Sequence, residues 1–374
     1  MMLPDYGGRE LGAVLTSSLS AIGAGGVVTA RDAKADQARL GIPDARHVCV
    51  AIIDGLGHLQ LEARKGHAPF LRSLAGATLT AGFPTTTAAS LALFGTGRTS
   101  GQTGMTGYTV RNPRTGKLAN LISWDGAEPA EDWQTQPSLL EEADHTGVKV
   151  TTLGKRRFAG SGLTHAVLRG GMFVGAERLA DRIDVALGAM LEPGVSYMYW
   201  GELDSAGHER GWQSHEWLAA LEDADRELAR LARSCPPDTV LVITADHGMV
   251  DVTGAPCWDI AEERELDRGV TFVAGEPRAL HLYSEEPEAV AARWAEVLGD
   301  HAVIGTRQEV AEAGLCGEIL PAVEERIGDV VVAMTGRSTV VDSRIQSAAS
   351  LGLVGVHGSL TAEELLIPLL VSVA

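Results

Sequence analysis

Cysteine and basic residues are both scarce in this chain of 374 residues. The four cysteines, Cys49, Cys235, Cys257 and Cys316, lie far apart and form no C-x-x-C pair, which indicates reduced thiols rather than a disulfide framework. We expect all four to be packing residues. The 31 Lys and Arg residues against 49 Asp and Glu residues give a formal net charge of -18. This charge argues against broad binding of nucleic-acid polymers or anionic membranes.

Long apolar runs are also absent. No run approaches the roughly 20 residues that a membrane helix needs, and the apolar segment LLIPLLVSV is interrupted by Pro368. The first residues are acidic early and lack a basic stretch followed by an apolar block, which is unlike a secretion signal. We therefore expect a cytoplasmic protein without a membrane partner. Internal repeats and linkers rich in Pro or Ser are missing as well, so a tandem architecture is not expected.

The composition that remains is that of an ordinary globular protein, with 45% hydrophobic and 21% charged residues. Runs rich in β-branched residues recur at HVCVAII, KVTTLG, VSYMYW and TVLVITA, and helical patterns separate them. One of these patterns, from Trp217 to Leu231, has an apolar and a charged face. Continuous apolar strands alternating with helices predict an α/β fold with a central, mostly parallel sheet and helices on both faces.

The pattern changes after His247. Shorter runs, VTFVA, RALHLYS and HAVIG, surround the helical segment PEAVAARWAEVLG. Strand, helix and strand in so short a stretch predict a small α+β insertion over approximately 271–317, within a single domain that spans 1–374.

Carboxylates and imidazoles stand where the predicted strands should end. These residues are Asp54 in AIIDGLG, Asp204 and His208 in ELDSAGH, Asp246 and His247 in TADHGM, and His357 in VGVHGS. In open parallel sheets the loops at the carboxyl ends of the strands form the ligand crevice. Hard oxygen donors mixed with imidazoles suit zinc or a similar divalent ion, and the set is larger than one tetrahedral site with an open position can use. It is sufficient for two ions, the arrangement of phosphatases and nucleases.

Simpler roles exist for each of these residues. Asp54 or Asp246 alone serves as well in a helix cap as in a metal site. Asp204 and His208, four residues apart, also suit a surface ion pair. His357 lies between Gly355 and Gly358 and is the least specific of these signals, so it is a candidate ligand only together with the other residues.

The threonine run FPTTTAAS precedes AASLALF, a predicted helix. One of Thr85, Thr86 and Thr87 is therefore a candidate N-cap and also a candidate nucleophile. A helix N-terminus stabilises both an alkoxide and the phosphate that it attacks. Because a threonine hydroxyl is a weak nucleophile until a base or metal removes its proton, this role depends on the metal site.

Taken together, the stretches AIIDGLG, FPTTTAASLALFGTGRTSGQTGMTGY, ELDSAGHERG, TADHGM and VGVHGSLTAEE resemble the alkaline phosphatase superfamily, and within it the nucleotide pyrophosphatase/phosphodiesterase branch. The resemblance implies two zinc ions. The implied ligands of one ion are Asp54, Thr87, Asp246 and His247, and those of the other are Asp204, His208 and His357. It also implies that Thr87 is the nucleophile and forms a phosphothreonine intermediate. Thr85 and Thr86 remain alternative candidates for the nucleophile.

Two positions depart from the family pattern. Ser90 and Tyr108 stand where the family usually has Asn, and a phenol differs from an amide in reach and shape. The loop with Lys155, Arg156, Arg157 and Phe158 is predicted to be a solvated basic loop. The alternative is that its Arg and Phe side chains hold an anionic, flat substrate group.

The predicted function is a metal-dependent hydrolase of phosphate diesters or nucleotide pyrophosphate bonds, with a small phosphoester or nucleotide as substrate. One alternative is a phosphomonoesterase or phosphomutase on the same scaffold. Another is a catalytically impaired metal-binding protein, whose altered Ser90 and Tyr108 have cost it activity. A sulfatase is disfavoured, because FPTTTAAS contains no cysteine from which its nucleophile could derive.

Overall fold

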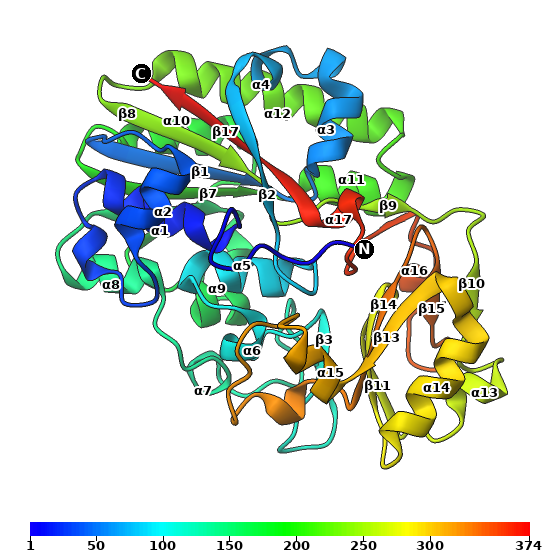
Figure 1. The fold of residues 1–374 in the computed structure, drawn as a ribbon. Coiled ribbons are helices and arrows are strands. Elements are labelled where there is room, and N and C mark those ends of the chain that lie inside the picture. Colours follow the sequence, from blue (N-terminus) through cyan, green and yellow to red (C-terminus); the bar gives the residue numbers. More distant parts are fainter.

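The structure, a computed structural model, describes residues 1–374 and contains a central sheet of 7 strands (Figure 1). In spatial order the strands are β2 (Ala75–Thr80), β17 (Leu366–Val373), β8 (Thr239–Thr244), β1 (His47–Ile53), β7 (Gly194–Trp200), β5 (Val150–Gly154) and β6 (Met172–Gly175). The neighbours from β8 to β6 are parallel, and only β17 runs antiparallel to the strands beside it. This confirms the predicted α/β fold with a mostly parallel sheet.

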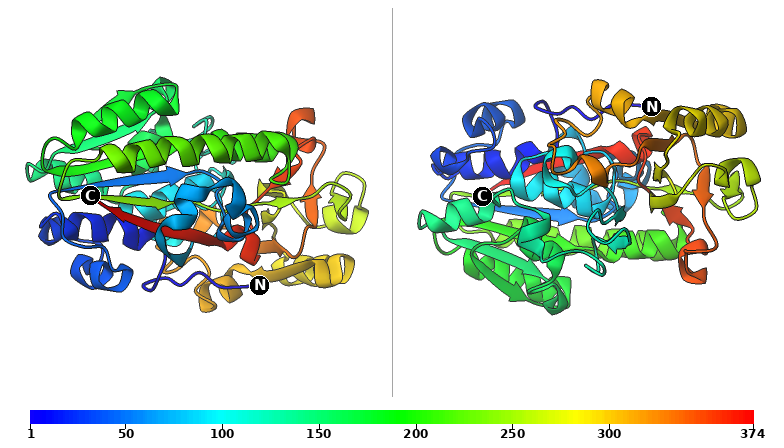
Figure 2. Two further views of the ribbon diagram at one scale, coloured as in Figure 1. Left: turned by 90° about the horizontal axis from the view of Figure 1, so that it is seen from above. Right: turned by 90° about the horizontal axis from the view of Figure 1, so that it is seen from below.

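Helices cover both faces of this sheet, and β1 and β8 are consequently buried along their whole length. One face carries α10 (Leu179–Ala189) and α12 (His215–Ser234), and the other carries α1 (Gly12–Ala21), α2 (Ala33–Leu40), α5 (Thr87–Thr96), α8 (Leu139–His145) and α9 (Gly162–Val167) (Figure 2). The predicted amphipathic helix lies within α12. Its N-cap is Ser214, whose hydroxyl accepts a hydrogen bond from the Trp217 amide at 3.1 Å.

Pro368 lies within β17, although proline cannot donate to a strand ladder. β17 pairs with β8 only from Leu370 to Val373, so the position of Pro368 is outside that ladder. The Pro368 carbonyl instead accepts a hydrogen bond from the Thr244 hydroxyl at 2.6 Å. The interrupted apolar run near the end of the sequence is thus an interior strand.

A second sheet of 4 antiparallel strands lies to one side of the central sheet, in yellow and orange in Figure 1. Its order is β11 (Phe272–Glu276), β12 (Ala279–Tyr283), β14 (Val330–Met334) and β13 (Ala302–Thr306). Helix α14 (Pro287–Leu298) packs on it, and the two share an apolar core that includes the fully buried Trp294. The sheet extends beyond residue 317, the predicted end of the insertion, because β14 pairs with both β12 and β13. The division into a main domain and an insertion remains our interpretation.

Short elements connect these two parts. The strand pairs are β3 (Thr109–Arg111) with β4 (Leu118–Asn120), β9 (Val250–Asp251) with β16 (Gly355–Val356), and β10 (Cys257–Asp259) with β15 (Thr339–Val341). The remaining helices are α3 (His58–Arg64), α4 (Pro69–Ser73), α6 (Ser100–Thr103), α7 (Ala130–Trp133), α11 (Glu202–Arg210), α13 (Arg264–Asp267), α15 (Arg307–Glu312), α16 (Ala348–Leu351) and α17 (Ala362–Leu365).

The fold bears on the expected role of the cysteines and on the length of the apolar helices. All four cysteines are free, but Cys257 is exposed, so the expectation that all four are packing residues is wrong for this one. It lies on the short strand β10, which belongs to a sheet of only 2 strands with β15. None of the helices combines the length and the apolar character that crossing a membrane requires.

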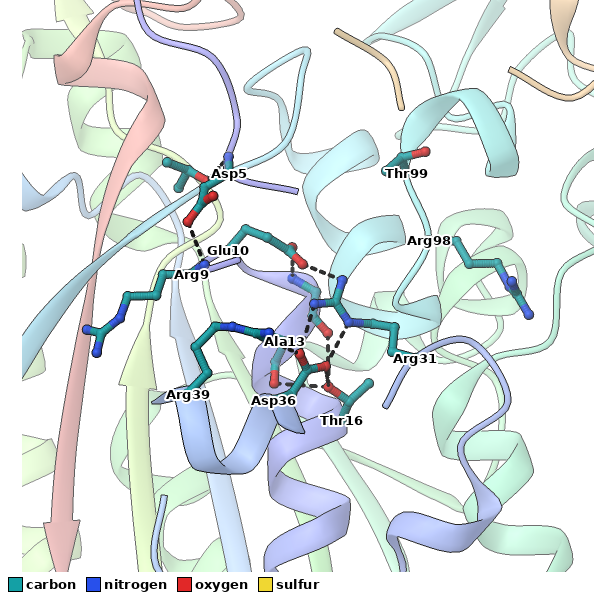
Figure 3. A network of polar contacts seen from close by, with 12 residues as sticks. Asp5, Arg9, Glu10, Ala13, Thr16, Arg31, Asp36, Arg39, Arg98 and Thr99 are labelled. Atoms are coloured by element: carbon teal, nitrogen blue, oxygen red, sulfur yellow. Dashed lines mark hydrogen bonds and ion pairs between the residues drawn. The ribbon is translucent and has the colours of Figure 1, made fainter. Parts of the chain in front are cut away.

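A buried polar network fastens α1 and α2 to the chain around them (Figure 3). The Arg31 guanidinium forms an ion pair with Glu10 and donates hydrogen bonds to Asp36 at 2.7 and 3.1 Å. The Asp36 carboxylate also accepts from the Thr16 hydroxyl and from Arg39, both at 2.7 Å. Each buried carboxylate therefore has a cationic partner, as the cost of burying charge requires.

Candidate metal centre

The site lies at the carboxyl ends of three adjacent strands. Asp54 directly follows β1, and Asp246 follows the neighbouring strand β8 after one residue, so their carboxylates meet at the same edge of the sheet. The Asp246 carboxylate accepts a hydrogen bond from the Gly55 amide at 3.2 Å, which ties the two loops together. On the other side of β1, β7 leads into α11, where Asp204 and His208 lie one turn apart.

The first predicted group of ligands converges on the His247 ring. Its Nε2 lies 3.4 Å from Asp54 Oδ1 and 3.7 Å from Asp246 Oδ2. The Thr87 hydroxyl, on the first residue of α5, is 3.2 Å from the same nitrogen. The structure therefore brings together Asp54, Thr87, Asp246 and His247, which come from three separate parts of the sequence.

The second predicted group lies beside the first. His208 Nε2 is 3.3 Å from Asp204 Oδ2 and 3.3 Å from His357 Nε2. The rings of His357 and His247 stack with centroids 3.6 Å apart, which joins the two groups. In addition, Asp54, Asp204 and His247 offer ligand atoms within 4.8 Å of one another. All seven predicted residues thus lie in one cluster, and their role as ligands remains a prediction.

The free atoms of the cluster suit divalent cations. Asp54 Oδ1, Asp204 Oδ1 and Asp246 Oδ2 are buried without a hydrogen-bond partner. Burial, followed by the negative charges of Asp204 and Asp246, raises the pKa of Asp54 well above its ordinary value. Unpaired buried carboxylates of like charge are costly in a folded protein unless a cation compensates them.

The three histidines are oriented for coordination through Nε2. The Nδ1 atoms of His208, His357 and His247 lie 2.7, 2.8 and 3.0 Å from the backbone carbonyls of Gly355, Thr85 and Gly248. Donation from Nδ1–H to a carbonyl leaves the Nε2 lone pair facing the cluster, the arrangement that metal-bound histidines adopt. Burial, and then the neighbouring His247 and His208 rings, lower the pKa of His357, which favours the neutral ring that binds metals.

The threonines differ in their surroundings. The Thr85 hydroxyl donates to the Ser359 carbonyl at 2.8 Å and accepts from the Gly358 amide at 3.1 Å, so it is engaged in holding the His357 loop. Thr86 is buried at the N-cap position of α5, and only the Thr87 hydroxyl contacts the cluster. The geometry favours Thr87 among the three candidates.

The two departures from the family pattern lie on different sides of Thr87. Ser90 is one turn further along α5 and is fully buried, with a hydroxyl that has no hydrogen-bond partner. Tyr108 is 43% exposed and borders the cleft described next. Neither side chain forms a hydrogen bond with the Thr87 hydroxyl.

A cavity of about 500 Å³, the metal cleft, opens over the cluster. Asp54, Thr87, Asp204, His208 and His357 line it, together with Lys155, Arg157 and Phe158 from the basic loop. Arg156 and Arg157 are exposed, as the prediction of a solvated loop requires, yet the loop also borders the cleft. The Arg157 guanidinium lies 5.1 Å from the centre of the Phe158 ring. The alternative substrate-binding role of this loop is therefore geometrically open.

A smaller apolar cavity of about 80 Å³ adjoins the metal cleft. The two cavities share Thr87, Ile122, Phe158 and Tyr199 as lining residues. The remaining wall is mainly aliphatic and aromatic and includes Leu91, Leu153, Leu163, Leu168 and Phe173. Thr87 therefore stands between a polar and an apolar space.

Two residues of the site were missed in the sequence. The Tyr199 hydroxyl donates a hydrogen bond to Asp54 Oδ2, and its position in β7 pairs with Ile52 of β1. A polar residue at the carboxyl end of a strand beside β1 is a signal that could have identified it. Glu276, at the end of β11, borders the metal cleft from the second sheet. No local signal marks Glu276, because its position depends on how the second sheet packs against the first.

Comparisons with known proteins give one family match and several similar folds. Residues 48–360 match the family model for type I phosphodiesterase/nucleotide pyrophosphatase. A phosphopentomutase from Symbiobacterium thermophilum is 30% identical over 122 residues, and the match spans 31% of this chain and only 29% of that relative.

Solved structures resemble the chain over most of its length. Murine ectonucleotide pyrophosphatase/phosphodiesterase 5 has a TM-score of 0.69 at 16% identity, covering 86% of this chain and 87% of that one. Phosphonoacetate hydrolase from Sinorhizobium meliloti 1021, in complex with phosphonoformate, has a TM-score of 0.66 at 18% identity, covering 88% and 91%. At these identities the likeness shows the shared fold.

Proposed function

Because the chain belongs to the type I phosphodiesterase/nucleotide pyrophosphatase family, we propose that it hydrolyses phosphate diesters or nucleotide pyrophosphate bonds through a phosphothreonine on Thr87. The family makes it a hydrolase of the phosphodiesterase/pyrophosphatase type that depends on metal. The observation that carries the proposal is the Thr87 hydroxyl 3.2 Å from His247 Nε2, at the edge of a cluster of unpaired carboxylates.

Two divalent ions, which we propose to be zinc, fit the two groups of ligands. When bound, such ions neutralise the charge of the phosphoryl group and make hydroxyl and water more acidic. The protein fixes the positions of the ligands: Tyr199 holds one oxygen of Asp54, and backbone carbonyls hold the histidine rings. These contacts orient ligands of both groups before any substrate arrives.

The reaction proposed at Thr87 has two displacements. In the first, Thr87 Oγ1 gives up its proton and forms a bond to phosphorus, while the bond from phosphorus to the leaving oxygen breaks and that oxygen takes up a proton. In the second, a water oxygen forms a bond to phosphorus, the bond from phosphorus to Oγ1 breaks, and one proton of the water returns to Oγ1. Thr87 is the first residue of α5, a helix of 10 residues, so the N-terminus of this helix would stabilise the negative charge of a phosphoryl group on Thr87.

The walls of the metal cleft support a substrate with a flat or apolar group next to the phosphate. Phe158 and Tyr199 meet edge to face, with ring centroids 5.8 Å apart, and both line the cleft and the apolar cavity. Arg157 adds a cation at the exposed side. A structure of the murine relative contains AMP, which agrees with a nucleotide-sized ligand.

A phosphomonoesterase or phosphomutase is the second candidate, and the partial match to a phosphopentomutase favours it. A monoester carries more negative charge and requires additional cationic contacts. Of the three Lys and Arg residues that line the metal cleft, two are already engaged: Lys155 pairs with Glu202 at 3.0 Å, and the Arg182 guanidinium donates to the carbonyls of Ala176, Glu177 and Tyr199. Only the exposed Arg157 is left for the additional charge of a monoester. The proposal of a diesterase therefore stands first.

One experiment tests both the preference for diesters and the role of Thr87 as nucleophile. Hydrolysis of bis(p-nitrophenyl) phosphate and of p-nitrophenyl phosphate is compared for the wild type, Thr87→Ala and Thr85→Val, with metal content measured on each protein. We expect a preference for the diester, and a loss of turnover of at least about 10³-fold in Thr87→Ala with both metals retained. Thr85→Val should be less stable but active, since its hydroxyl only holds a loop.

Full activity of Thr87→Ala would refute the nucleophile. A strong preference for the monoester would favour the second candidate. Two bound ions without activity on either ester, or on a wider set of phosphoesters, would indicate a metal-binding protein without turnover.

A further inference from the structure

A third cavity continues from the metal cleft into the space between the β3–β4 hairpin and the sheet of β11 and β12. This hairpin cavity has a volume of about 350 Å³. It shares Tyr108, Glu276, Pro277, Ser347 and Ser350 with the lining of the metal cleft. The volume is within the range of about 300–1,000 Å³ that is usual for small-molecule sites. A ligand held at Thr87 can therefore extend past Glu276 without leaving the protein.

Glu276 stands at the junction of the two cavities and is only 8% exposed. Its Oε1 is buried and has no hydrogen-bond partner. A carboxyl oxygen in this state lacks the contacts that normally compensate burial. Because Glu276 lines both cavities, a bound ligand can supply the hydrogen bond that its Oε1 lacks.

The remaining polar groups of the hairpin cavity show which chemistry fits. The carboxamide oxygen of Asn120 accepts from the amides of Ile122 and Ser123, both at 2.9 Å, and that of Gln346 accepts from the Asp342 amide at 3.1 Å. The NH₂ groups of both side chains are therefore left to donate. Two further carboxylates of the wall are already engaged, Asp342 by Arg344 and Asp125 by the Ser123 hydroxyl. The cavity thus offers amide donors together with the unpaired carboxyl oxygen of Glu276.

This mixture distinguishes between classes of ligand. An ammonium group only donates and would gain nothing from the amide donors, whereas an additional phosphate only accepts and would be repelled by Glu276 when it is charged. Hydroxyl groups both donate and accept, so they can satisfy both kinds of side chain. Aliphatic side chains such as Leu118, Val273 and Ile345 complete the wall and suit the carbon skeleton of a polyol.

We propose that the hairpin cavity is a subsite for a polyhydroxylated alcohol group of the substrate, and that Glu276 is the residue that selects it. This inference rests on the proposed phosphodiesterase function and specifies its substrate class. One ester group of the diester enters the hairpin cavity, while phosphorus lies at Thr87.

The test compares two diesters with the same p-nitrophenyl leaving group. The second ester group is 2,3-dihydroxypropyl in one and propyl in the other, so the two differ only in their hydroxyl groups. We expect kcat/KM of the wild type to be roughly tenfold or more higher for the dihydroxypropyl ester, since one hydrogen bond to a buried carboxyl group is worth about that factor.

Two variants locate the preference. Glu276→Met keeps the length of the side chain but cannot form hydrogen bonds, and it should bring the ratio of the two kcat/KM values close to one, mainly through a higher KM for the dihydroxypropyl ester. Gln346→Met, at a position that is half exposed, should lower the same ratio by a smaller factor. Glu262→Gln removes one negative charge from an exposed position outside the cavity and serves as the matched control.

The outcomes distinguish a failure of the subsite from a failure of the phosphodiesterase function. Equal hydrolysis of both esters by the wild type would overturn the subsite and leave the phosphodiesterase function intact. A preference that survives in folded Glu276→Met would overturn the role of Glu276, and one that survives in both variants would overturn the subsite as well. If neither ester is hydrolysed, the proposed function fails and the subsite with it.

Discussion

Glu276 carries an acidic group in a place that disfavours its charge. Burial raises its pKa to about 8, while the Thr86 side chain and the Tyr108 amide lower it in part and the negative Glu364 adds to the rise. The folded protein therefore holds a proton on Glu276 at pH values where the unfolded chain, with an ordinary Glu pKa of 4.5, has released it. The sign of the pH effect follows from this difference.

We predict that replacing Glu276 with Gln changes how stability depends on pH. Because the folded state binds the extra proton, Glu276 makes wild-type stability fall as the pH rises through the interval from 4.5 to about 8. Glu276→Gln removes this contribution. Thermal unfolding of both proteins at pH 5 and pH 9 measures it, and the difference in Tm between variant and wild type should be more positive at pH 9. A difference that is the same at both pH values, or larger at pH 5, would show that Glu276 is charged in the folded protein at low pH.

Glu276 is also a site residue that could not be predicted from the sequence. Asp54, Asp246 and His247 could be predicted because each follows a buried strand of the parallel sheet, where the chain reverses at the ligand crevice. Tyr199 carried a weaker signal of the same kind. The position of Glu276 depends on contacts between β11 and loops that lie more than a hundred residues earlier in the sequence, and no local pattern encodes such contacts.

Among the helices and strands, a buried ion pair links the turn after β11 to α17. The Arg278 guanidinium donates to Glu364 at 2.7 and 2.8 Å, and both side chains are fully buried. Glu364 also accepts from the Ser359 amide at 3.0 Å, within the loop that begins at His357. The turn that follows Glu276 and the loop that carries His357 are therefore held by the same carboxylate.

We predict that Arg278→Met destabilises the protein by about 3–5 kcal/mol, because it leaves Glu364 buried without its cation. The measurement is urea unfolding at equilibrium. Arg268→Met removes the exposed pair between Arg268 and Glu265, and it should cost at most about 1 kcal/mol. The double variant Arg278→Met/Glu364→Gln should recover part of the loss. Equal costs for the two single variants would show that the buried pair adds nothing specific.

The elements themselves show what a sequence pattern can and cannot supply. α12 and α5 form where the periodicity and the N-cap residues predicted them, because both signals are local. The second sheet exceeds its predicted end because β14 joins it after a stretch of loop and short helices, and this long-range pairing leaves no periodic trace. Boundaries set by pairing partners are therefore less predictable than those set by caps.

The whole molecule is acidic, and several of its carboxylates are close together at the candidate metal centre. The chain has a formal net charge of -18, and three carboxylates of the cluster have unpaired buried oxygens. We predict that removing the metals with a chelator lowers Tm, and that adding zinc restores it, because ligands that bind only the folded state stabilise it.

A variant makes this prediction sharper. Asp54→Asn removes one of the like charges, so its metal-free form should melt at a higher temperature than metal-free wild type, although it binds metal less tightly. Melting curves with and without chelator, together with metal analysis, give both values. Identical curves for wild type in the two conditions would contradict a dinuclear centre.

Strand β17 has a consequence for how the chain is made. It follows every other element in this sequence, yet it occupies an interior position of the central sheet, between β2 and β8. β2 has no other strand to pair with in that sheet. A nascent chain on the ribosome must therefore keep the edges of β2 and β8 apart and soluble until β17 has emerged, and until then both edges are exposed to chaperones and to premature self-association.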